Sequence, residues 1–225
     1  MASAFSAETY NSNEIFIQEA VAIRDSKTPI AGALKTLQKI IKSPLADGNA
    51  LAGVAEALVW TQTPTEKAEK MIQEIIDSPR SNHQTYAVIA YNLQTAVIPF
   101  PKTEKMLQQM IDSPKSDGET LGSIAMAIGL SKIPILNATK MLQQILDAPI
   151  STEDSLLGVS GAISNSQTPI IYADKMYLQI ISSPKAKRKT LDYVIYCLKN
   201  SKNHIENSDK LLQKIKQMLS DKGRL

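Results

Sequence analysis

Residues Thr85–Glu119 read TYAVIAYNLQTAVIPFPKTEKMLQQMIDSPKSDGE. This stretch is one copy of a unit that recurs every 35 residues. Ten of the eleven prolines mark the repeat, because they form two columns with that spacing, and only Pro101 lies outside both. The columns are Pro29, Pro64, Pro99, Pro134 and Pro169, and Pro44, Pro79, Pro114, Pro149 and Pro184. A fixed period in this range predicts stacked units that share one continuous core.

Each unit contains two apolar patterns with helical spacing. In the third copy the first pattern is Tyr86, Ile89, Ala90 and Leu93, and its offsets of three and four residues are those of a helix face. A second pattern of the same kind follows about twenty residues later, and short turns leave antiparallel pairs as the economical arrangement. We therefore predict an all-α fold, a right-handed α-solenoid of six two-helix repeats.

The repeats cover residues 15–49, 50–84, 85–119, 120–154, 155–189 and 190–224. We expect an N-terminal extension over 1–14 and a single solenoid domain over 15–225. The last repeat is predicted to be a C-terminal cap, since His204 and Leu219 replace both column prolines and its second helix is rich in lysine.

Local motifs predict where the helices end. Ser-Pro pairs at 43–44, 78–79, 113–114 and 183–184 are expected to end second helices, because a residue before proline is disfavoured in the α region. Capping boxes are predicted at 81–84, 116–119 and 151–154, each with the serine as N-cap, and at 11–14 for the first helix. Thr28, Thr63 and Thr168 each precede a proline, which predicts an N-cap followed by proline at the first helical position.

Composition excludes several classes of protein. Hydrophobic residues make up 43% of the chain and charged residues 21%, which disfavours disorder. We see no secretory signal and no run long enough to span a membrane, so a cytoplasmic location is expected. One cysteine excludes an internal disulfide, and two histidines far apart from it give no nucleophile–base pair and no metal set. We therefore expect no enzymatic activity, no cofactor and no metal.

The first helices of the units carry few charges. Between Leu51 and Asn165, the four helices of this kind contain one charged residue, Glu56. Such a helix is either enclosed or lines a groove that a partner fills, and its glycines imply close backbone approach to a neighbour or a ligand. Aromatic and methionine side chains favour a protein-binding groove, and the alternative is that they only seal the seams between helices. The candidate groove residues are Glu56, Val59, Trp60, Val88, Tyr91, Gln94, Met126, Leu130, Asn165, Tyr193 and Tyr196.

Basic residues form two further patterns. Each second helix has a lysine in one column, Lys35, Lys70, Lys105, Lys140, Lys175 and Lys210, which we interpret as a solvated face, with an anion-tracking ridge as the alternative. From Lys185 onward the chain has eleven Lys/Arg against four Asp/Glu, a net +7, within an overall charge of +3. Its densest cluster is Lys185, Lys187, Arg188 and Lys189, which is either an exposed turn or a nucleic-acid contact.

Paired helices with this period, and an alanine early in the second helix (Ala33, Ala68, Ala138, Ala173), resemble the tetratricopeptide and pentatricopeptide helical-repeat proteins. The resemblance implies an α-solenoid, and the pentatricopeptide family reads RNA with one base per repeat. At the positions that family uses for reading, this chain pairs Gly53 with His83 and Val88 with Gly118. The resemblance therefore implies the fold rather than base reading.

Two functional hypotheses follow. The first is a non-enzymatic scaffold that binds a protein or peptide segment along the first-helix face. The alternative is a helical-repeat protein that binds nucleic acid, in particular RNA, through its basic C-terminal end. A third interpretation is a scaffold secreted by a bacterium into a host cell as an effector; the Lys-, Ile- and Gln-rich composition fits it, without a motif.

Overall fold

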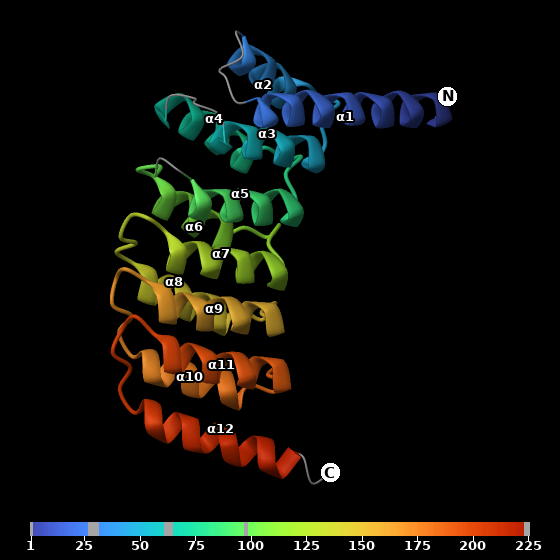
Figure 1. Cartoon of the computed structure of the whole chain (residues 1–225). Coiled ribbons are helices and arrows are strands. Elements are labelled where there is room, and N and C mark those ends of the chain that lie inside the picture. Colours follow the sequence, from blue (N-terminus) through green and yellow to red (C-terminus); the bar gives the residue numbers. More distant parts are fainter. Residues whose placement is uncertain (1, 27–31, 61–64, 97–98, 223–225) are drawn as a thin grey trace. The chain divides into compact units, whose positions relative to one another are not determined.

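A computed structural model describes residues 2–26, 32–60, 65–96 and 99–222. Over these ranges the chain forms twelve helices in regular pairs and no strand (Figure 1). Their bounds are α1 Ala2–Asp25, α2 Ala33–Lys42, α3 Gly48–Trp60, α4 Thr65–Asp77, α5 His83–Thr95, α6 Thr103–Ile111, α7 Gly118–Leu130, α8 Ala138–Asp147, α9 Glu153–Asn165, α10 Ala173–Ser182, α11 Arg188–Asn200 and α12 Ser208–Lys222. The predicted all-α fold of paired helices is confirmed.

The chain divides into two compact units, Met1–Met106 and Leu107–Leu225, with the boundary inside α6. In the first unit, α3 packs between α1 and α5, and α2 packs against α4 (Figure 1). The odd-numbered helices are the first helices of the repeats, so this unit has one layer of first helices and one of second helices. Its core contains fully buried Leu51, Leu58, Ile72 and Ile75.

In the second unit, α9 packs between α7 and α11, and α10 packs between α8 and α12. Glycines bring α7 and α9 unusually close. A methyl group added to Gly158 would lie 2.8 Å from the Cα atom of Gly122, and one added to Gly129 would lie 2.9 Å from the Cβ atom of Ala162. Close approach to a neighbouring helix, one of the two expected roles of the glycines, is therefore confirmed here.

The predicted ends of the second helices are confirmed. Helix α2 ends at Lys42 with Ser43 as its C-cap, and α10 ends at Ser182 with Ser183 as its C-cap. Helix α4 ends at Asp77, immediately before the Ser78-Pro79 pair. Proline geometry thus stops these helices where the sequence predicts.

The predicted starts of the first helices are wrong by one residue. Asn82, not Ser81, is the N-cap of α5, and its side-chain oxygen accepts a hydrogen bond from the Thr85 N–H at 2.9 Å. Asp117 and Thr152 take the same place before α7 and α9. The hydroxyl of Ser81 instead donates to the carbonyl of Ile75, where it closes the end of α4.

Two further predicted helix starts are wrong. Helix α1 begins at Ala2 rather than after Asn11, and Asn13 inside it accepts a hydrogen bond from the Asp47 N–H at 2.8 Å. Helix α10 begins at Ala173, so Thr168 is not its N-cap. The preceding residue, Tyr172, has a left-handed backbone (φ 61°) and turns the chain into the helix. Thr28 and Thr63 lie outside the described residues.

A repeated hydrogen bond fixes neighbouring first helices in register. The Thr85 hydroxyl donates to the carbonyl of Gly48 at 2.9 Å, and the Ser155 hydroxyl donates to that of Gly118 at 2.7 Å. In both cases the third residue of one first helix satisfies a carbonyl at the start of the preceding one. All four groups are buried, so each bond removes a desolvation cost as well as aligning the helices.

Candidate functional site

In the first unit, two exposed aromatic side chains lie on neighbouring first helices. Trp60 at the end of α3 is 52% exposed, and Tyr91 of α5 is 57% exposed. The Trp60 indole donates to the Asn92 side-chain oxygen at 2.9 Å, and the Asn92 amide donates to the Val88 carbonyl at 2.8 Å. An aromatic ring held in this way loses little further freedom when a partner covers it.

The other candidate residues of the first unit are less accessible. Val59, Val88 and Gln94 are half-buried. Glu56 is paired with Arg24 of α1, with a distance of 2.9 Å between the Arg24 Nη1 and Glu56 Oε2 atoms. The hydrogen bonds that Arg24 donates to Asp25 and Glu56 raise the pKa of Arg24, so this charge is permanent. Glu56 therefore joins α3 to α1.

In the second unit, candidate residues from three helices meet around Gly161 of α9. A methyl group at Gly161 would lie 2.6 Å from the Met126 sulfur and 2.9 Å from the Tyr193 hydroxyl, so these side chains occupy the space above the glycine. Tyr196 stacks on Tyr193 with ring centroids 6.1 Å apart and planes 16° apart. The Asn165 amide donates to the Gly161 carbonyl at 2.9 Å.

We call Met126, Gly161, Tyr193 and Tyr196 the tyrosine cluster. Tyr196 is its exposed member, at 60%, whereas Tyr193 and Met126 are half-buried. Burial, together with the neighbouring Cys197, raises the pKa of Tyr193, so its hydroxyl stays protonated and able to donate. Leu130, one turn after Met126 on α7, is partly exposed. The cluster offers a partner aromatic faces, a thioether and a hydroxyl with no net charge.

The basic turn before α11 is largely occupied by local contacts. The Lys185 ammonium donates to the carbonyls of Ser151 at 2.6 Å and Pro149 at 3.3 Å. Lys187 pairs with Glu153 at 3.3 Å, and Arg188 pairs with Asp192 at 3.7 Å. Burial alone would raise the pKa of Glu153, but hydrogen bonds from Thr190 and Lys187 outweigh it and lower that pKa.

Sequence reasoning missed one role for this turn. Arg80 occupies the same repeat position as Lys185, and its guanidinium donates to the carbonyls of Ile41, Ser43 and Ala46. Both side chains therefore bind carbonyl groups at the end of the preceding repeat. The two basic residues are 105 residues apart, which is three repeat periods, and this shared repeat position is the signal that points to the structural role.

The single cysteine belongs to the core of the second unit. Cys197 is buried beside Tyr193 and Tyr177, and the Tyr177 hydroxyl donates to the Ser160 carbonyl at 3.0 Å. Burial raises the pKa of the Cys197 thiol to about 11, although hydrogen bonds with Tyr193, Tyr177 and Ser164 oppose the shift. A thiol with this pKa is a poor nucleophile near neutral pH.

Within the described ranges, no group of three His, Cys, Asp or Glu side chains is placed to hold a metal ion. None of the helices described there combines the length and the apolar character needed to cross a membrane. Comparisons of the chain with family models, with curated proteins and with solved structures gave no match.

Proposed function

We propose that this protein is a non-enzymatic interaction scaffold, built as a right-handed α-solenoid, that binds a protein segment on its first-helix layer. The observation that carries the proposal is the tyrosine cluster, in which residues from α7, α9 and α11 meet above Gly161. Aromatic side chains dominate the energetics of protein interfaces.

Two features support binding rather than seam sealing. Tyr196 leaves more than half of its surface in solvent, although a residue that only seals a seam would bury its ring. The stacked Tyr193 ring and the Gly161 backbone hold the neighbouring groups in place, which lowers the entropic cost of association. Trp60 and Tyr91 provide a second pair of exposed rings within the first unit.

Selection from a displayed library of random peptides tests the proposal. The purified full chain is used as bait, and the selected peptides are measured against the wild type and against Tyr196→Glu and Met126→Glu. Charge at either position has to be desolvated under the bound segment, so we expect affinity to fall at least about tenfold, equivalent to about 1.4 kcal/mol.

Leu136→Glu is the matched control, since Leu136 is 80% exposed and lies in the turn before α8 rather than in a first helix. It should bind the selected peptides as the wild type does. Far-UV circular dichroism of each variant verifies that the helices are retained. Peptides that bind Tyr196→Glu and Met126→Glu as tightly as the wild type would refute binding at the tyrosine cluster.

Nucleic-acid binding at the basic turn stays a prediction. Three of its four basic side chains, Lys185, Lys187 and Arg188, each bind a neighbouring carbonyl or carboxylate. A phosphate would have to displace those contacts, so we do not advance this turn as a second function.

A further inference from the structure

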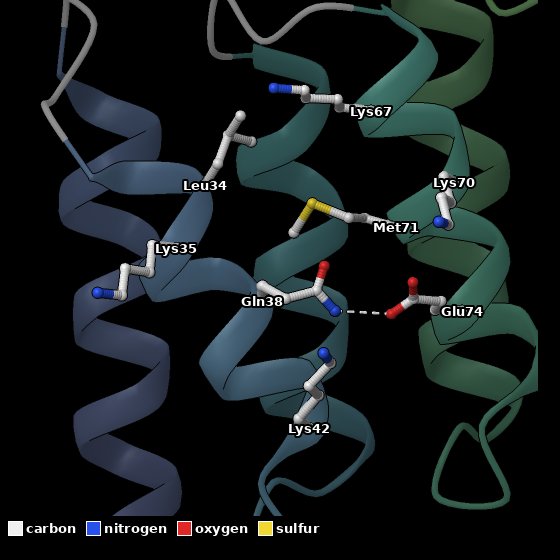
Figure 2. Close-up of a pocket in the computed structure, with 8 residues that line it drawn as sticks. All are labelled: Leu34, Lys35, Gln38, Lys42, Lys67, Lys70, Met71 and Glu74. Atoms are coloured by element: carbon white, nitrogen blue, oxygen red, sulfur yellow. Dashed lines mark hydrogen bonds between the residues drawn. The ribbon is translucent and has the colours of Figure 1, made fainter.

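A cleft lies between α2 and α4 in the first compact unit (Figure 2). Its volume is about 340 Å³, which is at the lower end of the range of about 300–1,000 Å³ found for small-molecule sites. Leu34 of α2 and Met71 of α4 contribute apolar lining between the two helices. The cleft is on the second-helix layer and is independent of the proposed protein-binding face.

Four lysines line this cleft: Lys35 and Lys42 from α2, and Lys67 and Lys70 from α4. Among the described residues, none of these four ammonium groups has an ion-pair or hydrogen-bond partner. Figure 2 shows Lys67 extending from α4 toward α2, and Lys42 reaching from the last turn of α2 toward the middle of the cleft. A concave surface lined by one sign of charge focuses its field and concentrates counter-ions.

The cleft contains one carboxylate, that of Glu74, and its position is fixed. Its Oε2 atom accepts a hydrogen bond from the Gln38 amide at 2.7 Å, which joins α2 to α4 (Figure 2). Four lysines and one glutamate leave the lining with a net charge of +3. Glu74 therefore does not neutralise the cleft.

The repeat shows why the charge collects here. In the next three repeats the position of Lys42 is an aspartate (Asp77, Asp112 and Asp147), and in the second unit the Gln144 amide donates to the Asp112 carboxylate at 2.6 Å. Glu74 occupies the repeat position of Gln144. At α2 and α4 a lysine thus replaces the aspartate that accepts in other repeats, and no ion pair between Lys42 and Glu74 takes the place of that bond.

We propose that this cleft binds a compact anion that carries two or more phosphate groups. The ammonium groups of Lys42 on α2 and of Lys67 and Lys70 on α4 come from both sides of the cleft, which suits a ligand that spans it, whereas Figure 2 shows the Lys35 ammonium directed away from α4. Lysine binds phosphate as a point charge, whereas planar carboxylates are best matched by the arginine fork. The lining contains lysines and no arginine, which favours phosphate over carboxylate.

Isothermal titration calorimetry of the full chain with sodium tripolyphosphate tests the proposal. We expect one site per chain, with affinity that falls steeply as salt is added, because exposed charges are screened within about 10 Å at 0.1 M salt. The double variant Lys42→Gln, Lys67→Gln should bind at least about tenfold more weakly, since it loses two charge-assisted contacts. Glu74→Gln should bind more tightly, because the change removes the carboxylate and keeps an acceptor for Gln38.

The matched control is Lys105→Gln with Lys140→Gln. These lysines occupy the repeat position of Lys35 and Lys70 but do not line the cleft. The control removes the same charge as the test variant, and circular dichroism checks that both remain helical. The proposal is overturned if the wild type does not bind tripolyphosphate, if the control loses as much affinity as the test variant, or if orthophosphate binds as tightly as tripolyphosphate.

Discussion

Gly158→Ala should destabilise the protein, although alanine is the better helix former. A methyl group at this position would lie 2.8 Å from both the Cα and carbonyl carbon atoms of Gly122, and closer still to the Gly122 oxygen. Carbon atoms in contact are about 3.5–4.0 Å apart, so the overlap is on the order of 1 Å. The atoms in the way belong to the backbone of α7, which cannot rotate aside as a side chain can.

The magnitude follows from two opposing effects. Overpacking of a close-packed contact costs about 1–3 kcal/mol, and replacing glycine by alanine inside a helix gains about 1 kcal/mol. Since the clash is with backbone, we expect the upper part of the first range and a net loss of about 1–2 kcal/mol. Helices α7 and α9 would have to separate, which also weakens the packing of Ala162 against Gly129.

Gly53→Ala is the matched control, because Gly53 occupies the same repeat position as Gly158. Here the nearest atom to an added methyl group is the Ala20 Cβ at 3.5 Å, an ordinary contact. The helix-propensity gain of about 1 kcal/mol is then unopposed. The same substitution at the same repeat position should therefore change stability in opposite directions.

Urea unfolding followed by far-UV circular dichroism measures both changes, with the midpoint compared to that of the wild type and the slope checked for constancy. We expect a lower midpoint for Gly158→Ala and a higher one for Gly53→Ala. A higher midpoint for both variants would show that α7 and α9 are not in backbone contact, and the account of the glycines would be wrong.

Three further predictions concern single side chains. Arg80→Ala should lower the free energy of unfolding by about 1–3 kcal/mol, because three carbonyls lose a charged donor. Arg80→Lys should restore part of this stability, since Lys185 binds carbonyls in the same way in its own repeat. A urea midpoint of Arg80→Ala within error of the wild type would contradict this role. Cys197 should react slowly with Ellman's reagent at pH 8, because its pKa of about 11 leaves little thiolate. The reaction rate should increase in urea, and in the folded protein it should increase as the pH approaches 11. Rapid reaction of the native protein at pH 8 would exclude the buried thiol. Asn92→Ala should shift the fluorescence of Trp60, the chain's one tryptophan, to longer wavelength and lower its anisotropy, because the indole loses its hydrogen-bond acceptor. An unchanged spectrum would mean that this hydrogen bond does not hold the ring.

The prolines were sufficient to predict where second helices end, because the restriction they impose on the preceding residue is local. The starts of first helices were harder, since two overlapping motifs satisfy the same rule. Ser81 with Gln84 and Asn82 with Thr85 both have a capping oxygen and a polar third residue. The choice between them depends on a distant group, the Gly48 carbonyl that Thr85 reaches at 2.9 Å. Local sequence carries no information about that partner.

The Thr168-Pro169 pair was misinterpreted for a related reason. Pro169 lies four residues before α10, and the intervening turn ends in the left-handed conformation of Tyr172. Gly32 and Asn207, at the same repeat position, also have positive φ, and glycine and asparagine adopt that conformation most readily. A tyrosine at this position does not predict a residue with positive φ. Asn137, at the same repeat position, has φ −93°, so this left-handed turn is not common to every repeat.

The exposed face of the first helices differs from their core in a way that bears on function. One core column reads Val54, Ile89, Ile124, Val159 and Val194, and every member is buried. Uniform size is expected there, because close packing tolerates little change in volume. The column two residues later reads Glu56, Tyr91, Met126, Gly161 and Tyr196.

That outer column ranges from the smallest side chain to two tyrosines, and packing between repeats dictates only its buried glycine, Gly161, above which Met126 and Tyr193 lie. Solubility alone does not dictate the column either, since four of its five members carry no charge. The side chains of this column vary in size while most of them remain uncharged. A surface that is complementary to a particular apolar partner requires this pattern. Partner specificity should therefore map to the exposed members of this column, and substitutions at Tyr91 and Tyr196 should redirect binding while the buried column keeps the helices folded.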